Sequence, residues 1–131
     1  MLADSDVVTF VPTLDLERAR AFYERTLGLR FVEDIGIAIV LDASGTMLRI
    51  TSVPELRPAG YTILGWSVHD LTGTVRRLAE QGVAFERYRG LAQDGDAIWL
   101  APGGDRVAWF KDPDGNTLSL TEFAGGGPSG R

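Results

Sequence analysis

The clearest structural signal in the chain lies at residues 106–123, which read RVAWFKDPDGNTLSLTEF. Apolar residues recur at alternate positions on both sides of the central Asp-Pro-Asp-Gly-Asn. Alternation is typical of strands, proline presets φ for a turn, and glycine and asparagine tolerate positive φ. The stretch therefore predicts a β-hairpin with its turn at 112–116.

An internal repeat organises the rest of the chain. Each half is expected to begin with a strand and a helix, the first helix running from Asp15 to Gly28 and the second from Asp70 to Gly82. The capping aspartates are 55 residues apart and the terminating glycines 54. The expected strands cover 7–12, 29–33, 37–41 and 47–53 in the first half, and 61–69, 83–88, 97–100, 107–111 and 117–122 in the second.

Two repeats are too few for an open array, so they are expected to pair in one closed domain. The sequence predicts an α+β fold in which two βαβββ modules form a curved mixed sheet around a cleft, with both helices outside. A single domain is expected over 1–123, with modules at 7–53 and 61–123, a Pro- and Gly-containing linker at 54–60 and a flexible tail at 124–131. The 131 residues, 44% of them hydrophobic, suffice for one core.

Composition excludes several classes of function. A formal net charge of -5 and a pI near 4.8 argue against a nucleic acid partner. Without cysteine the chain has no disulfide, thiolate nucleophile or Cys-ligated zinc, which suits a reducing cytoplasm. No apolar run approaches the roughly 20 residues of a membrane span, and the acidic N-terminus does not resemble a signal peptide. We expect a cytoplasmic protein with no membrane partner.

Two motifs resemble the vicinal oxygen chelate superfamily, which includes glyoxalases, bleomycin resistance proteins and extradiol dioxygenases. One is the aromatic-x-x-Asp-Pro-Asp-Gly-Asn of residues 109–116. The other is VPTLDLERARAFYERTLGL at 11–29, where a capping Asp leads to Phe-Tyr and then Leu-Gly. The resemblance extends from Val7 to Phe123, and the Val-Pro entry is most similar to the bleomycin-resistance and related drug-binding branch. It implies a homodimer with clefts near the subunit interface.

Catalytic branches of this superfamily bind one divalent metal through His, Gln or Glu side chains on the first and last strands of each module. The matched positions here hold Val8, Ile63 and Ser119, and Arg49 is the only charged residue at 48–51, where the fourth falls. Alkyl groups, a hydroxyl and a guanidinium do not replace imidazoles and carboxylates. The sequence therefore predicts no metal, no other cofactor and no catalytic residue.

An enzyme remains the alternative: a glyoxalase- or dioxygenase-like lyase or oxidoreductase with a displaced metal site, or a metal-independent isomerase. It would depend on His69, the single histidine, or on Glu122 near the end of the last strand. His69 stands beside the capping Asp70, where a surface or capping role is simpler, and a lone carboxylate near a terminus is usually solvated. A regulatory or immunity protein that binds another protein is a further alternative.

Strand alternation gives the candidate ligand-binding residues, which are expected to face the cleft: Phe10, Gly65, Ser67, Trp109, Thr117 and Ser119. Such a lining suits a flat or amphipathic organic molecule held by stacking and hydrogen bonds, with Gly65 leaving space beside it. The alternative is that Phe10 and Trp109 fill a closed core. Parity places Trp66 toward the helix and leaves the orientation of Trp99 open.

These observations predict a metal-free small-molecule binding protein of the bleomycin-resistance type, which sequesters an antibiotic or aromatic metabolite without chemical change. The net negative charge slightly favours a cationic ligand, although salt screens this attraction within about 10 Å. Four basic side chains could each supply a cation for an anionic group of a ligand, but they lie at strand edges or turns, where a solvated charge is the simpler expectation: Arg49, Arg89, Arg106 and Lys111.

Overall fold

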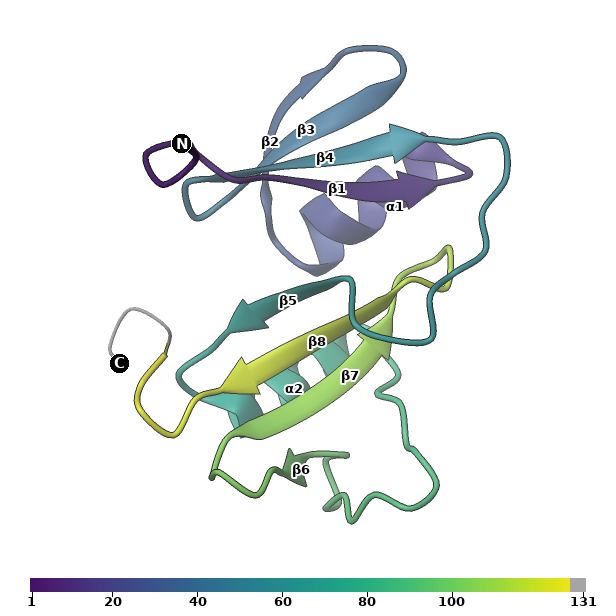
Figure 1. The fold of residues 1–131 in the computed structure, drawn as a ribbon. Coiled ribbons are helices and arrows are strands. Elements are labelled where there is room, and N and C mark those ends of the chain that lie inside the picture. Colours follow the sequence, from purple (N-terminus) through teal and green to yellow (C-terminus); the bar gives the residue numbers. More distant parts are fainter. Residues whose placement is uncertain (128–131) are drawn as a thin grey trace. The chain divides into compact units, whose positions relative to one another are not determined.

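The computed structural model describes residues 1–127, and residues 128–131 of the predicted tail lie outside this part. The chain divides into two compact units, Met1–Arg57 and Pro58–Arg131. Each unit contains one four-stranded sheet with a helix on one face (Figure 1). The predicted α+β fold with two βαβββ modules is confirmed.

The first unit is built from β1 (Val8–Thr13), α1 (Leu16–Arg20), η1 (Ala21–Thr26), β2 (Arg30–Asp34), β3 (Ala38–Ala43) and β4 (Thr46–Ser52). Its strand order is β1-β4-β3-β2, in which β1 and β4 are parallel and the other neighbours antiparallel. Ala19 and Tyr23 of the helical segment are at most 1% exposed and belong to the same core as Leu48 and Ile50 of β4. The helix thus buries one face of this sheet.

The second unit repeats this topology with β5 (Leu64–Ser67), α2 (Leu71–Glu80), β6 (Trp99–Leu100), β7 (Arg106–Lys111) and β8 (Thr117–Glu122). The order is β5-β8-β7-β6, again with a parallel pair, β5 and β8, at one side. Leu71 and Val75 of α2 are buried, as are Phe110 and Leu118 of the sheet. Figure 1 shows α2 against one face of β7 and β8.

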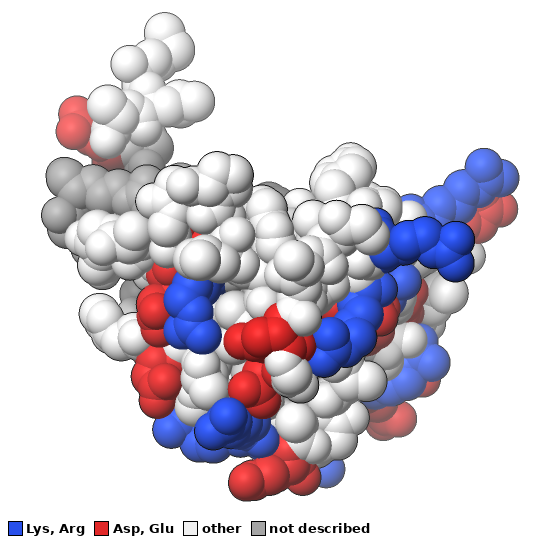
Figure 2. Space-filling model, turned by 90° about the horizontal axis from the view of Figure 1, so that it is seen from below, with Lys and Arg blue, Asp and Glu red and all other residues white. Residues whose placement is uncertain are grey.

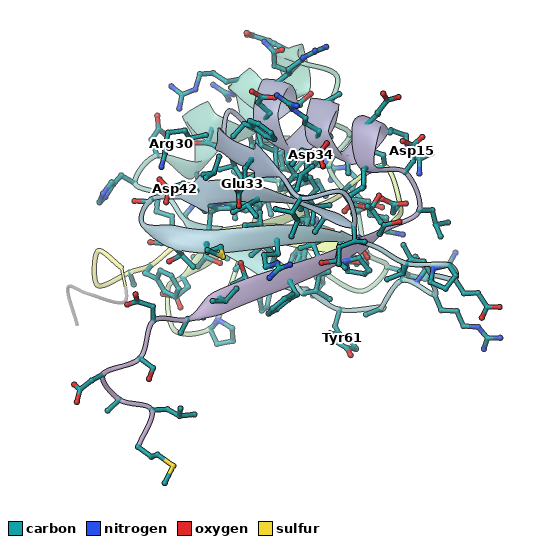
Figure 3. All side chains as sticks on the ribbon, turned by 90° about the horizontal axis from the view of Figure 1, so that it is seen from above. Asp15, Arg30, Glu33, Asp34, Asp42 and Tyr61 are labelled. Atoms are coloured by element: carbon teal, nitrogen blue, oxygen red, sulfur yellow. The ribbon has the colours of Figure 1, made fainter. Side chains whose placement is uncertain are left out.

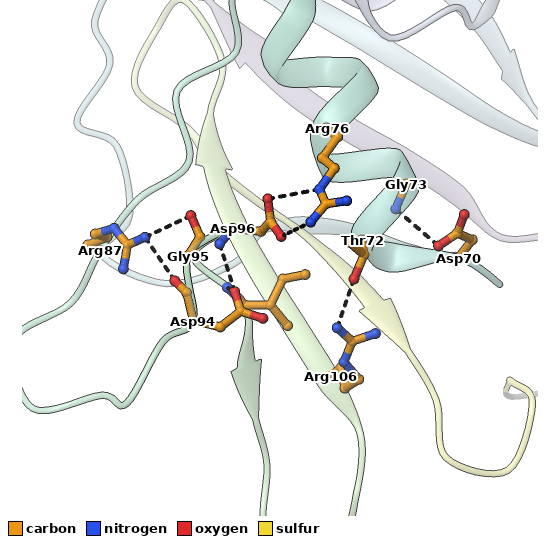
Figure 4. Close-up of polar contacts among 10 residues, drawn as sticks. Asp70, Thr72, Gly73, Arg76, Arg87, Asp94, Gly95, Asp96 and Arg106 are labelled. Carbon is orange, nitrogen blue, oxygen red and sulfur yellow. Dashed lines mark hydrogen bonds and ion pairs between the residues drawn. The ribbon is translucent and has the colours of Figure 1, made fainter.

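Both helices begin where their capping aspartates predict. The Asp15 carboxylate accepts from Arg18 N at 3.1 Å, and the Asp70 carboxylate accepts from Gly73 N at 3.0 Å (Figure 4). The end of α2 is a Schellman motif, in which Gly82 N donates to Ala79 O and Val83 N donates to Leu78 O. Gly82 has the φ of +94° that this motif requires.

One local feature of the first helix was not predicted. After α1 the chain continues as the π-helical η1, where Leu27 N donates to Phe22 O at 2.9 Å. Such i→i+5 bonds occur as short insertions in α-helices. The apolar spacing of this segment does not distinguish the two kinds of helix.

The strand predicted at 83–88 is wrong. Phe85 forms only an isolated bridge to Phe110, and the segment otherwise carries no strand. The Gln93 side chain explains the difference, because it accepts from Tyr88 N and donates to Glu86 O and Ala97 O. These backbone groups are therefore not available to a sheet.

Two further predicted strands are shorter in the structure. The strand expected at 97–100 is reduced to β6, because Ala97 has a φ of +62°, which an extended strand does not accommodate. The strand expected at 61–69 is limited to β5 at Leu64–Ser67.

The predicted hairpin is present, with its turn closed by Asp112. Gly115 N donates to Asp112 O at 2.9 Å, and Asp112 N donates to Asn116 O at 3.0 Å. The buried Asp112 carboxylate also accepts from Asp114 N, Asn116 N and Asn116 Nδ2 at 2.8–2.9 Å. Gly115 has a φ of +87°, and a Cβ there would lie 3.2 Å from Pro58. Asp112 and Gly115 thus fix the register of β7 with β8.

The distribution of charged side chains on the surface agrees with a chain that contains both acidic and basic residues. Acidic and basic side chains are interspersed on the face that Figure 2 shows. Among residues 1–127, none of the helices has the length and apolar character that a membrane crossing requires.

We predict that Asp112→Ala lowers the free energy of unfolding by about 1–3 kcal/mol, because it removes the acceptor of several buried donors. Asp112→Asn keeps an acceptor oxygen and should lose less. Urea denaturation gives the difference. Asp4→Ala is the matched control, since Asp4 is exposed and makes no hydrogen bond within the described residues. Equal stability of Asp112→Ala and Asp4→Ala would contradict this account of the turn.

Candidate functional site

The second sheet has one face that α2 does not cover. Its central row consists of Gly65, Ser119 and Trp109, which are Cα partners across β5, β8 and β7. Arg106 and Glu122 point to the opposite side, where Arg106 donates to Thr72 Oγ1 and Glu122 accepts from Leu71 N, both at the start of α2. The central row therefore lies on the open face.

An aromatic cluster, Tyr88, Trp99 and Trp109, occupies this open face. Trp109 is its centre, with the Tyr88 ring at a centroid distance of 5.4 Å in an edge-to-face arrangement and the Trp99 ring at 6.0 Å. Both tryptophans are half-buried, and Tyr88 is 38% exposed. The cluster thus presents accessible ring surface beside the hydroxyl of Ser119, an arrangement suited to a planar apolar molecule.

The loop at 86–98 holds Tyr88 and Trp99 against Trp109. Besides the Gln93 contacts, Asp94 Oδ1 accepts from Asp96 N at 2.8 Å and Ile98 N at 3.0 Å, and Arg87 Nη2 donates to Asp94 O and Gly95 O (Figure 4). These bonds tie the two ends of the loop together, so polar side chains of the loop position the segments that carry the aromatic rings.

The Tyr88 hydroxyl keeps its proton near neutral pH and can therefore donate a hydrogen bond. Burial raises the pKa of Tyr88 above its ordinary value, and the nearby Glu86 charge adds to the effect, while Lys111 opposes it. Glu86 and Lys111 form an ion pair at 3.5 Å on the surface beside the cluster.

Five of the six sequence-predicted residues lie in the second unit. Ser119 and Thr117 are buried, and Thr117 Oγ1 donates to Ala59 O at 3.3 Å. Ser67 is exposed, and a Cβ on Gly127 would lie 3.1 Å from its hydroxyl. The space above Gly65 is taken by Ser119, whose Oγ would be 2.9 Å from a Cβ at residue 65.

The sixth residue, Phe10, belongs to the first unit. Its side chain is 62% exposed, whereas its neighbour Val11 is 1% exposed and faces the helix. Phe10 therefore lies on the open face of the first sheet and does not fill a closed core. Its ring is 5.8 Å from the guanidinium carbon of Arg49.

Sequence reasoning did not place Tyr88 or Trp99 in the site, and it did not predict that Arg49 has a buried, unpaired nitrogen. Tyr88 lies on a segment wrongly expected to be a strand. Strand alternation does not predict the side to which Trp99 points, because β6 contains only two residues. Arg49 was expected to be solvated, but its Nε is buried without a hydrogen-bond partner.

The residues present do not fit the metal site of the catalytic branches. Val8, Ile63 and Ser119 stand at three matched positions, and the fourth falls within 48–51, where Arg49 is the only charged residue. Residues 1–127 contain no group of three His, Cys, Asp or Glu that could hold a metal ion. Glu122 has both oxygens engaged, one by Leu71 N at 3.0 Å and one by Arg106 at 3.2 Å.

Comparison with known proteins identifies the superfamily to which the chain belongs. The sequence matches the Glyoxalase/Bleomycin resistance protein/Dioxygenase superfamily over residues 6–120, so the chain belongs to this superfamily. The comparison with curated proteins found no match.

Solved structures agree in fold. The antibiotic binding protein TnmS3 from a Streptomyces species is 27% identical, with a TM-score of 0.71 over 93% of this chain and 98% of the other. A superfamily member from Sphaerobacter thermophilus is 24% identical, with a TM-score of 0.74 over 94% and 100%. The bleomycin resistance determinant encoded on the transposon Tn5 is also 24% identical, with a TM-score of 0.72 over 92% and 98%.

We predict that Glu122 is structural. Glu122→Ala should lower the free energy of unfolding by about 1–3 kcal/mol, because Leu71 N and Arg106 lose an acceptor within a half-buried contact. Glu122→Gln retains one acceptor and should cost less. Both variants should bind small molecules as the wild type does. Unchanged stability together with lost binding would show that Glu122 belongs to a ligand site instead.

Proposed function

We propose that the protein binds a small organic molecule with a flat aromatic part and holds it without chemical change, as a metal-free binding protein of the bleomycin-resistance type. An antibiotic or an aromatic metabolite is the expected ligand. The observation that carries this proposal is the accessible cluster of Tyr88, Trp99 and Trp109 on the face of the second sheet that α2 does not cover.

The residues have separate roles in this proposal. Trp109 stacks on the ligand, and Trp99 and Tyr88 enclose its edge. Tyr88 and the hydroxyls of Ser67 and Ser119 supply hydrogen bonds, while Thr117 supports β8 through Ala59. Gly65 has no side chain and therefore leaves room for the Ser119 hydroxyl beside it. Phe10 is a second exposed aromatic residue, on the first unit.

Family membership supports a small-molecule role but is compatible with both binding proteins and enzymes, as the superfamily's description states. Two observations favour binding. The matched metal positions lack suitable donors, and a structural neighbour at 27% identity is described as an antibiotic binding protein. Glu122 serves the helix, and His69 is exposed beside the cap of α2, so neither supports the enzyme alternative.

We further propose a cytoplasmic homodimer in which residues 1–123 act as one functional domain. The homodimer follows from the resemblance to the drug-binding branch, and the cytoplasmic location from a chain without cysteine. Light scattering coupled to gel filtration measures the dimer directly.

Tryptophan fluorescence tests the proposed function, because two of the three tryptophans lie in the cluster, while the third, Trp66, stacks on Phe110 at a centroid distance of 6.4 Å on the α2 side of the sheet. We predict that at least one member of a panel of aromatic antibiotics, beginning with bleomycin, quenches emission with a saturable curve. Mass spectrometry should recover the compound unchanged. Trp109→Leu should weaken binding at least about tenfold through lost stacking.

Leu100→Ala is the control, since Leu100 is exposed on β6 directly after Trp99. It should leave the affinity unchanged. Absence of quenching across the panel, or conversion of the bound compound, would contradict the proposal, as would equal losses in Trp109→Leu and Leu100→Ala.

A further inference from the structure

The open face of the first sheet contains two buried polar atoms without partners. Arg49 and Thr51 lie two residues apart on β4, so their side chains share a face. Arg49 Nε and Thr51 Oγ1 each have less than 1 Å² of exposed surface and make no hydrogen bond. Burying an unpaired donor of a charged group is costly, and proteins seldom retain such a group without a use for it.

Acidic residues of the same unit do not neutralise Arg49. Asp42 of β3 forms an ion pair with Arg30 at 3.5 Å and accepts from Gly45 N. Figure 3 labels Arg30, Asp42 and Glu33 on β2 and β3. Glu33 is in register with Val40, which is itself the partner of Arg49, so the two charges are separated by one strand. Arg49 thus has no ion pair within the described residues.

The residues that pair with Arg49 on the neighbouring strands are apolar. Its partners in register are Phe10 on β1 and Val40 on β3, and the Phe10 ring lies 5.8 Å from the guanidinium carbon. A cavity of about 320 Å³ lies on the same unit and includes Val40, the partner of Arg49, in its lining. Val8 and Met47 also line it, together with the charged residues Asp6, Arg30 and Asp42, whereas Phe10, Arg49 and Thr51 do not. This volume lies at the lower end of the range for small-molecule sites.

We propose that Arg49 and Thr51 form a subsite for the carboxylate of a small organic acid. The apolar part of the acid lies against Phe10 and extends toward the cavity at Val8 and Met47. This inference rests on the proposed small-molecule binding function and names the chemical class of the ligand. It replaces the weak preference for a cationic ligand that net charge alone suggests, because a local unpaired guanidinium outweighs a distant, screened charge.

The identity of the orphaned atoms favours a planar acid. Nε–H and one Nη–H of arginine point in parallel along one edge of the guanidinium, and two carboxylate oxygens match this edge. Because Nε makes no hydrogen bond, it can donate to a carboxylate oxygen once the side chains that cover it move aside, since less than 1 Å² of its surface is exposed. The Thr51 hydroxyl lies on the same face two residues further along β4 and can donate to one of the same oxygens.

The test compares 2-naphthoate with its neutral analogue 2-naphthamide by nuclear magnetic resonance titration, including the arginine Nε–H signals. The expected result is that 2-naphthoate binds wild-type protein at least about tenfold more tightly and shifts the Arg49 Nε–H signal. Arg49→Gln should abolish this preference without changing the binding of 2-naphthamide, and Thr51→Val should reduce it.

Arg25→Gln is the matched control, because Arg25 is exposed on η1, on the helical side of the sheet, and should keep the full preference. Equal binding of 2-naphthoate and 2-naphthamide overturns the subsite, as does an unchanged preference in Arg49→Gln or the absence of any binding. Tighter binding of 2-naphthyl phosphate than of 2-naphthoate contradicts a planar acid. The proposed small-molecule function is judged separately by the antibiotic titration, which reports on Trp99 and Trp109.

Stability distinguishes recognition from a structural role. If Arg49 is retained for a ligand, Arg49→Gln should unfold at an equal or higher urea concentration than the wild type, because an unpaired buried donor is relieved. Addition of 2-naphthoate should raise the midpoint of the wild type and not that of the variant. A lower midpoint for Arg49→Gln without ligand contradicts the proposal.

Discussion

Packing of one helix against one face of each four-stranded sheet is the constraint on which the rest of the structure depends. In the first unit the helix contributes Tyr23 to a core with Leu48 and Ile50, and in the second α2 contributes Leu71 to a core with Phe110. Because strand side chains alternate, every second residue is committed to that core. The intervening residues are not needed for that core, and both candidate sites consist of them apart from Tyr88, which a loop supplies.

The two open faces use this freedom differently. On the second sheet, rings gather around Trp109, and the polar groups near them are largely engaged in holding the loop that carries Tyr88. On the first sheet, Arg49 and Thr51 have hydrogen-bonding groups that the protein does not satisfy. Burying unpaired polar atoms such as Arg49 Nε and Thr51 Oγ1 costs stability, and the proposed acid subsite gives these atoms a use.

Much of the fold could be predicted from the sequence, because the decisive signals are local. Asp15 and Asp70 cap helices, Gly82 terminates one, and the Asp112 turn sets a hairpin register. The prediction of a strand at 83–88 failed because the Gln93 side chain binds Tyr88 N and Glu86 O. Such side-chain contacts leave no periodic pattern in a sequence.

The candidate site was predictable to the extent that strand parity determines it. Strand alternation places Trp109 and Phe110 on opposite faces of the sheet, and it places Ser119 on the same face as Gly65, as the structure shows. It does not place Tyr88, which lies on an irregular segment, and it does not reveal whether Arg49 has a partner. Both depend on tertiary contacts, which become visible only when the chain is folded.

Native mass spectrometry of the purified protein, combined with elemental analysis, distinguishes a metal-free binding protein from a metal-dependent enzyme. We expect a protein without stoichiometric divalent metal that carries one small organic molecule per binding site, released with unchanged mass on denaturation. Near-stoichiometric divalent metal that persists through dialysis would contradict this expectation and would assign the chain to a catalytic branch of the superfamily.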